Sequence, residues 1–191
     1  MVQPQSQVHV MVDNIAVGQR LPSRVIRKTF GPVFASDSGI LLREGFLDFI
    51  HKIFAAGIGF NILLFCRDGD GIEIVSWIKW RLLDGTSVDE LRDVVVKIIS
   101  SLNDSRAIEG VIAIDESSQW MVYDDMALDF SLFTLDIKCS RSDAIRDLQD
   151  SGYFMTRREM VSSMSGDASS SHIPYTKDFL TSFLRNFEDV V

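Results

Sequence analysis

The hydrophobic pattern of the chain alternates between stretches typical of strands and stretches typical of helices. Nearly continuous apolar segments of strand length cover residues 8–13, 60–67, 110–114 and 132–138. Continuous runs of this kind are typical of strands whose two faces are both buried. Residues 14–41 contain several prolines and glycines, and they predict irregular chain with a short hairpin around the stretch VIRKTFGPVF.

Helical spacing separates these strand-like segments. Residues 43–56 and 72–83 both place apolar side chains three and four positions apart, the second stretch directly after a DGDG turn. Ser87 to Glu90 form a capping box that predicts the start of a third helix, and residues 142–149 predict a short fourth one. Because strands that alternate with helices favour crossover connections, we expect an α/β fold. The expected form is a three-layer Rossmann-like domain with a mostly parallel central sheet.

The C-terminal part has a different composition. The small, polar stretch SSMSGDASSS predicts a flexible linker, and an amphipathic helix follows it, with Phe179, Phe183 and Phe187 on one face. The predicted organisation is therefore an α/β domain over residues 1–161, a Ser-rich linker over 162–174 and a C-terminal helix over 175–191. The apolar face of this helix either docks on its own domain or binds a protein partner.

Composition narrows the possible partners and the compartment. The 191-residue chain has a formal net charge of −8, which suits neither nucleic acid nor an anionic membrane surface. Its basic clusters, at residues 20–28 and 157–158, are either solvated faces or local anion sites. Cys66 and Cys139 lack metal-ligand spacing and predict reduced, buried thiols. With no signal-peptide pattern and no long apolar run, the sequence predicts a cytoplasmic protein.

Candidate chemistry is confined to the ends of the predicted strands. The three histidines form no metal-binding pair, and no nucleophile elbow, P-loop or dinucleotide-binding glycine motif occurs. Instead, Asp13 follows the first strand, Cys66 ends the second, and Asp115 with Glu116 follows the third. In a parallel sheet these ends would meet at one crevice, where carboxylates could bind Mg²⁺. One of the acids could also attack a phosphoryl group as a nucleophile.

Two segments carry a resemblance to a known family. LLREGFLDFIHKIFAAGIGFNILLFC and KIISSLNDSRAIEGVIAIDES are similar in order, spacing and hydrophobic pattern to segments of the haloacid dehalogenase superfamily, nearest its C-terminal-domain phosphatase branch. The resemblance covers roughly residues 8–150. It implies a Mg²⁺-dependent hydrolase acting on a phosphorylated substrate.

The resemblance also implies a role for each matching residue. Asp13 would be the phosphoryl-accepting nucleophile and a Mg²⁺ ligand, and Cys66 would hold a phosphoryl oxygen where the family has Thr or Ser. Lys97, or Arg106 if the register is shifted, would neutralise the developing charge, and Asp115 with Glu116 would complete the metal site.

The chain departs from the family's pattern at its first motif. Ile15 replaces the second aspartate, the general acid/base, whose contribution is typically about 10²–10⁴-fold. A fold with a degraded site and a binding or scaffolding role is therefore our first interpretation. An active Mg²⁺-dependent phosphatase is the alternative, and Asp13 would be a plain turn acid if neither holds. A metal-dependent nuclease of the PIN/NYN type, which also begins with a strand ending in an acid, is a second alternative.

Overall fold

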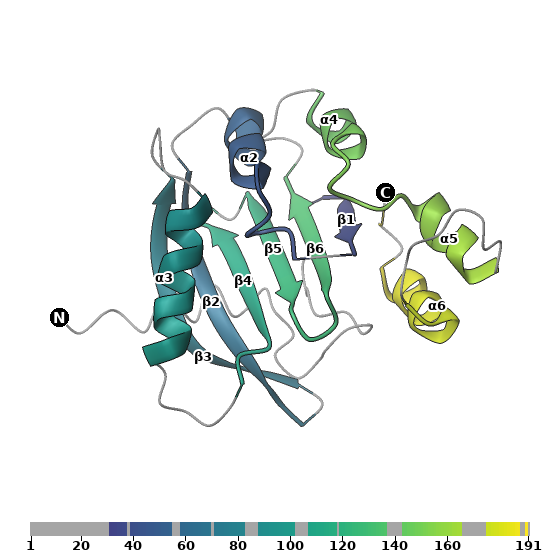
Figure 1. Cartoon of the computed structure of the whole chain (residues 1–191). Helices are drawn as coiled ribbons and strands as arrows, with labels where there is room; N and C mark the ends of the chain where they lie inside the picture. The colour runs from purple at the N-terminus through teal and green to yellow at the C-terminus, as the bar shows by residue number, and fades with distance from the viewer. Residues whose placement is uncertain are drawn as a thin grey trace.

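The structure is a computed structural model of the chain (Figure 1), and it describes residues 31–37, 39–54, 58–69, 71–82, 88–101, 107–117, 119–136, 143–165, 175–187 and 190. Its elements are, in chain order, β1 (Val33–Ser36), α2 (Phe46–Phe54), β2 (Ile58–Asp68), β3 (Gly71–Leu82), α3 (Val88–Ser101), β4 (Gly110–Asp115), β5 (Trp120–Asp125), β6 (Phe130–Leu135), α4 (Ala144–Asp150), α5 (Arg157–Ser165) and α6 (Lys177–Asn186). The predicted strand at residues 8–13 lies outside the described residues.

The strands form a six-stranded sheet in the order β1-β6-β5-β4-β2-β3, and every neighbouring pair is antiparallel. The expected mostly parallel, three-layer Rossmann-like sheet is therefore wrong. Strands β4, β5 and β6 follow one another through short turns, which leave no room for the crossover helices that parallel pairing requires. Among the described elements, α2 and α3 make crossovers: α2 connects β1 to β2, which run in the same direction, and α3 connects β3 to β4 on the two sides of β2.

The main local error of the sequence interpretation concerns β3. The pattern at residues 72–83 predicts a helix, whereas Gly71–Leu82 is a strand paired with β2 along its whole length. The chain reverses between the opposed residues Asp68 and Gly71, with Gly69 at a φ of +58°, a conformation that glycine adopts without steric cost. β2 and β3 are thus the arms of a long hairpin. The sequence interpretation also missed β5, whose six residues are all buried.

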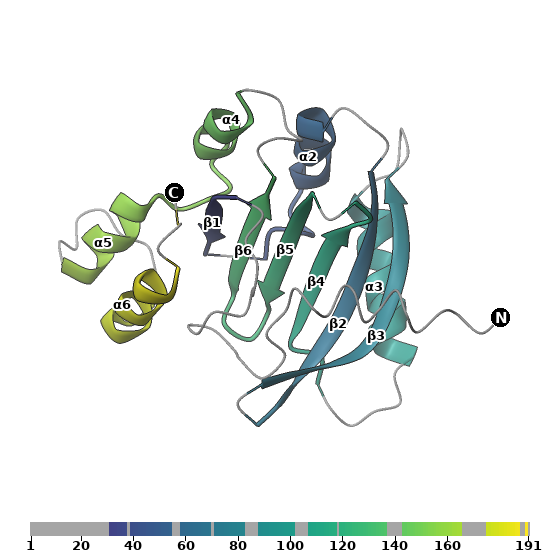
Figure 2. The ribbon, with the colours of Figure 1, turned by 180° about the vertical axis from the view of Figure 1, so that it is seen from behind.

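Both faces of the sheet are covered by apolar side chains, which explains the continuous hydrophobic runs in an antiparallel sheet. Helices α2, α3 and α4 pack on one face (Figure 1). Helices α5 and α6 contribute to the core on the opposite face and lie beside β1 at the end of the sheet, as the view from behind shows (Figure 2).

The predicted helices over 43–56, from Ser87 and over 142–149 are confirmed as α2, α3 and α4. The predicted strands at 60–67, 110–114 and 132–138 are likewise confirmed as β2, β4 and β6.

A buried carboxylate fixes the loop between β1 and α2. Asp124 on β5 is 4% exposed, and its two carboxylate oxygens accept hydrogen bonds from the backbone N–H of Ile40 at 3.4 Å and of Leu41 at 3.0 Å. The N–H of Ile40 also donates to the hydroxyl of Ser131, at 3.3 Å. Because burial disfavours the charged form, the pKa of Asp124 rises to about 6, against the lowering effect of these hydrogen bonds.

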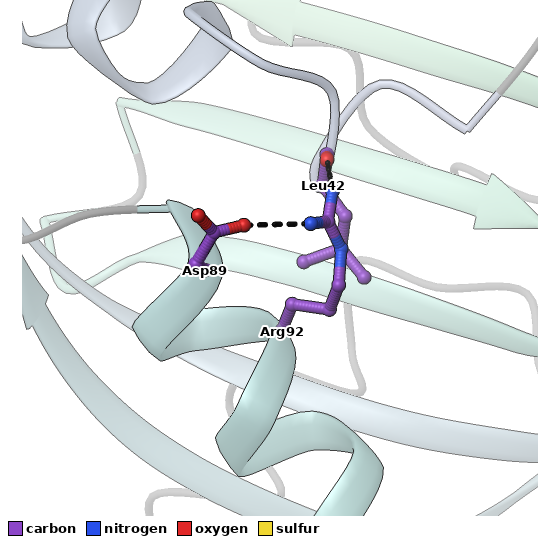
Figure 3. Close-up of polar contacts among 3 residues, drawn as sticks. All are labelled: Leu42, Asp89 and Arg92. Carbon is purple, nitrogen blue, oxygen red and sulfur yellow. Dashed lines mark hydrogen bonds and ion pairs between the residues drawn. The ribbon is translucent and has the colours of Figure 1, made fainter.

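Two further side chains hold the same loop from outside the sheet. Arg92 on α3 donates to the carbonyl of Leu42 at 3.0 Å while its guanidinium pairs with Asp89 at 2.7 Å (Figure 3). The hydroxyl of Tyr153 donates to the carbonyl of Glu44 at 3.1 Å. The loop is therefore fixed to three elements that lie far apart in the sequence.

The C-terminal helix α6 packs on its own domain. Thr176 is its N-cap and accepts a hydrogen bond from the N–H of Phe179. Phe183 and Phe187 are fully buried, with ring centroids 4.8 Å apart, and Phe183 also meets Phe130 of β6 at 5.0 Å. Since these side chains are used inside the fold, the structure does not support the predicted partner contact through Phe179, Phe183 and Phe187.

The predicted linker overlaps a helix at its start. α5 continues to Ser165, three residues beyond Ser162, and it begins with a capping box in which Thr156 and Glu159 exchange hydrogen bonds. The remainder of the predicted linker, residues 166–174, lies outside the described part of the chain. Within that described part, no helix combines the length and the apolar character needed to cross a membrane.

Candidate functional site

Asp115, predicted as a metal ligand, ends β4 and organises the turn that follows. One oxygen of its carboxylate accepts hydrogen bonds from the N–H of Ser117 at 2.9 Å and of Gln119 at 3.2 Å. Burial raises the pKa of Asp115, while these N–H bonds act in the opposite direction. The contacts are those of a turn-forming aspartate.

Glu116, the other predicted ligand on this turn, forms an ion pair instead. Its Oε1 lies 2.6 Å from Nζ of Lys79 on the edge strand β3. Gly59 on β2 is between them in the sheet, and a Cβ at that position would come within 2.7–3.0 Å of the Glu116 carboxylate. The lack of a side chain at Gly59 therefore allows the carboxylate to lie over β2 and reach Lys79.

The antiparallel sheet separates the other predicted site residues. Phe60 pairs with Asp115 at one end of the β2–β4 ladder and Phe65 pairs with Gly110 at the other, with Cys66 one position further on. At about 3.3 Å per residue, Cys66 and Asp115 are roughly 20 Å apart along the strands. Adjacent antiparallel strands have their carboxyl ends at opposite ends of the ladder, so the side chains of Cys66 and Asp115 do not share a crevice. Cys66 itself is buried and belongs to no disulfide among the described residues.

Of the remaining predicted site residues, only Lys97 is among the described ones. Lys97 lies on α3 with an exposed side chain, and Asp13 lies outside the described residues, as does Arg106. Among the described residues there is no cluster of three or more His, Cys, Asp or Glu side chains able to hold a metal ion. Asp115 and Glu116 make the contacts described above, and the predicted Mg²⁺ site, which includes Asp13, stays a prediction.

The most distinctive surface feature in the described part of the chain is the edge strand β3. It is twelve residues long, and within the described residues its only neighbouring strand is β2. Large apolar side chains on both of its faces are only partly buried; they are Ile74, Val75, Trp77, Ile78 and Trp80. Long edge strands with apolar side chains are the usual places where another chain adds a strand.

The position of Lys79 strengthens this assignment. A lysine in the middle of an edge strand normally discourages pairing with another chain. Here the ammonium group is drawn back across β2 to Glu116. The charge therefore lies over the sheet, on the side away from the outer edge.

A signal for this edge was present in the sequence. Gly-Asp between two apolar runs indicates a two-residue hairpin loop, and residues 72–80 are rich in Ile, Val and Trp, which favour strands. The helical spacing obscured it. The ladder shows why, because the register shifts at Leu64/Phe65 and leaves Val75 as an extra residue. A β-bulge of this kind breaks the alternation of a strand and produces spacings of three and four.

Comparisons of the chain with known protein families, with characterised proteins and with solved structures found no match.

Proposed function

We propose that the protein is a binding module without efficient phosphohydrolase activity, which engages another polypeptide along the outer edge of β3. The observation that carries the proposal is the edge strand itself, with twelve residues, one described neighbour and partly buried apolar side chains on both faces. Strand addition would satisfy the outward backbone groups of β3 and cover Trp77 and Trp80.

The contacts of the predicted catalytic residues support the non-catalytic part of the proposal. Asp115 organises a turn, Glu116 pairs with Lys79, and Cys66 is at the far end of the ladder. The resemblance to the haloacid dehalogenase superfamily stays a prediction, and the antiparallel sheet is not the fold which that resemblance implied. The proposal keeps the predicted cytoplasmic location, in which the buried thiol of Cys66 stays reduced.

Hydrogen exchange tests the binding edge directly. The protein is diluted until its measured mass is that of a single chain, and the exchange of β3 amides is followed residue by residue. N–H groups of β3 that point away from β2 should exchange as exposed amides, while the alternate ones should be protected by the ladder. Protection of both sets in the dilute protein would overturn the proposal, because the edge would already be covered within the chain.

A phosphatase assay tests the absence of efficient catalysis. Hydrolysis of p-nitrophenyl phosphate is measured with and without Mg²⁺ for the wild type and for Asp13→Asn. We expect the same background rate in all four measurements. Mg²⁺-dependent turnover that disappears in Asp13→Asn would contradict the proposal and establish the phosphatase alternative.

A further inference from the structure

The outer edge of β3 is complementary to itself when two copies run antiparallel. We propose that the partner at this edge is a second copy of the chain, paired with the first about a two-fold axis that passes beside Trp77. This inference depends on the proposed function above, since it names the partner for the same surface.

The register follows from the two faces of β3. Residues that stand opposite each other across two strands must lie on the same face of the sheet. The ladder to β2 gives these faces: Trp77 opposes Leu63 and Ile74 opposes Phe65, and all four side chains belong to the core on one face. Ile78 and Trp80 pack against the core on the other face. The bulge at Val75 keeps Ile74 and Trp77 on one face although they are three residues apart.

A two-fold axis at Trp77 satisfies this condition along the whole strand. It places Trp77 opposite its own copy, Ile74 opposite Lys79, and Ile72 opposite Arg81. Each of these pairs lies on one face of the sheet, and Val75, the bulge residue, has no opposite residue. This register pairs the strand from Ile72 to Arg81, which is nearly its full length.

The distribution of charge favours the antiparallel arrangement. The two basic residues of β3, Lys79 and Arg81, are both in its second half, and the first half holds Glu73 as its only charged residue. Antiparallel copies bring the second half of one strand against the first half of the other, so no like charges stand directly opposite. A parallel arrangement would place Lys79 beside Lys79 and Arg81 beside Arg81, and like charges directly opposite are destabilising.

The proposed register determines which side chains of the two copies lie close together, and disulfide formation between introduced cysteines can measure this. Opposite residues in an antiparallel pair have Cβ atoms about 4.5–5.5 Å apart. Two cysteines at position 77 would therefore be close enough for a disulfide, whereas two cysteines at position 79 would be four ladder positions apart, roughly 13 Å along the strand. A single strand pair is a small interface, so we expect a weak dimer whose population increases with concentration.

The experiment uses the full chain. The mass of the wild type is measured by light scattering from low to high micromolar concentration, and Trp77→Cys and Lys79→Cys are oxidised and examined on non-reducing gels. We expect the mass to rise from 21.5 kDa towards twice that value. We also expect a cross-linked dimer for Trp77→Cys and none above the wild-type background for Lys79→Cys. The wild type is the control for the native cysteines.

Trp77 is partly buried against the core, so the Trp77→Cys variant could fail to fold. A second pair of variants therefore tests the same register at other positions. Ile74→Cys is mixed with Lys79→Cys, since these positions are opposite in the proposed register, and the mixture should cross-link while each protein alone should not. A dimer without either cross-link would overturn the inference by placing the interface elsewhere.

The same measurements separate this inference from the proposed function. A single-chain mass at every concentration, together with exposed outward amides on β3, would overturn the second copy as partner and leave the proposed function standing. Outward amides that are protected in the single chain would overturn both.

Discussion

Replacing Asp124 by asparagine should remove the pH dependence that this residue gives to folding. The carboxylate is buried, no basic group is among the described groups that act on it, and its pKa rises from 3.8 to about 6, chiefly through loss of hydration. The nearby charge of Asp129 adds to the rise, and the hydrogen bonds from Ser131, Leu41 and Ile40 oppose it. The folded protein therefore holds a proton on Asp124 more tightly than the unfolded chain does.

The sign and size of the effect follow from linkage. A group whose pKa is raised in the folded state contributes stability that is fully present below pH 3.8 and is lost as the pH rises through about 6. The rise of the pKa from 3.8 to about 6 corresponds to about 3 kcal/mol between the acid and neutral limits. The amide that replaces the carboxyl group cannot ionise, and it would lose one of the two backbone hydrogen bonds, at about 1 kcal/mol. We expect Asp124→Asn to be less stable than the wild type near pH 4 and more stable, by about 1–2 kcal/mol, at pH 7.

The measurement is urea unfolding, followed by tryptophan fluorescence, at intervals from pH 4 to pH 8. Asp93→Asn, the same change at an exposed position of α3, controls for the altered net charge. The wild-type and Asp124→Asn stability curves should cross between pH 4 and pH 7. A difference between them that stays constant over this range would refute the reasoning, because it would show that Asp124 has similar proton affinity in the folded and unfolded states.

Three further predictions concern packing and the ion pair over β2. Gly110→Ala should destabilise the fold by about 1–3 kcal/mol, measured by urea unfolding, because the new Cβ would collide with the ring of Phe65; an unchanged midpoint would contradict this. Phe183→Ala should cost about 3–5 kcal/mol in the same assay, since the ring is fully buried between sheet and helix, and a loss below about 1 kcal/mol would show that α6 is not docked. Glu116→Gln should cost less than about 1 kcal/mol, because the side chains of Lys79 and Glu116 are 55% and 32% exposed; a double-mutant cycle with Lys79→Met that gives a larger, salt-independent coupling would refute it.

The sequence predicts most of the helices and half of the strands of this fold, because each of those segments carries one clear periodicity. The apolar stripe of α2 faces the core as expected, and that of α6 follows the first of its two alternatives and packs on its own domain, with Phe46 and Leu180 fully buried. The pairing of the strands was wrong for a physical reason. A strand covered on both faces has a continuously apolar sequence whether its neighbours are parallel or antiparallel. The apolar run at 60–67 therefore could not distinguish parallel from antiparallel pairing.

The candidate site depended on that pairing. Acids at the carboxyl ends of parallel strands would have gathered at one edge, whereas antiparallel strands place Cys66 and Asp115 at opposite ends of the β2–β4 ladder. The edge of β3 was missed because the bulge at Val75 gives a strand the spacing of a helix. The contact between Glu116 and Lys79 joins residues 37 positions apart, and no local pattern indicates such a contact.

The way β1 is held has a consequence for the synthesis of the protein. β1 pairs with β6, about a hundred positions further along the chain, and it forms isolated bridges to Met155 and Val190, further still. During translation its apolar residues emerge long before any of these partners exists. β1 can therefore join the sheet only after the ribosome has delivered β6, and until then its apolar residues lack the strand with which they pair.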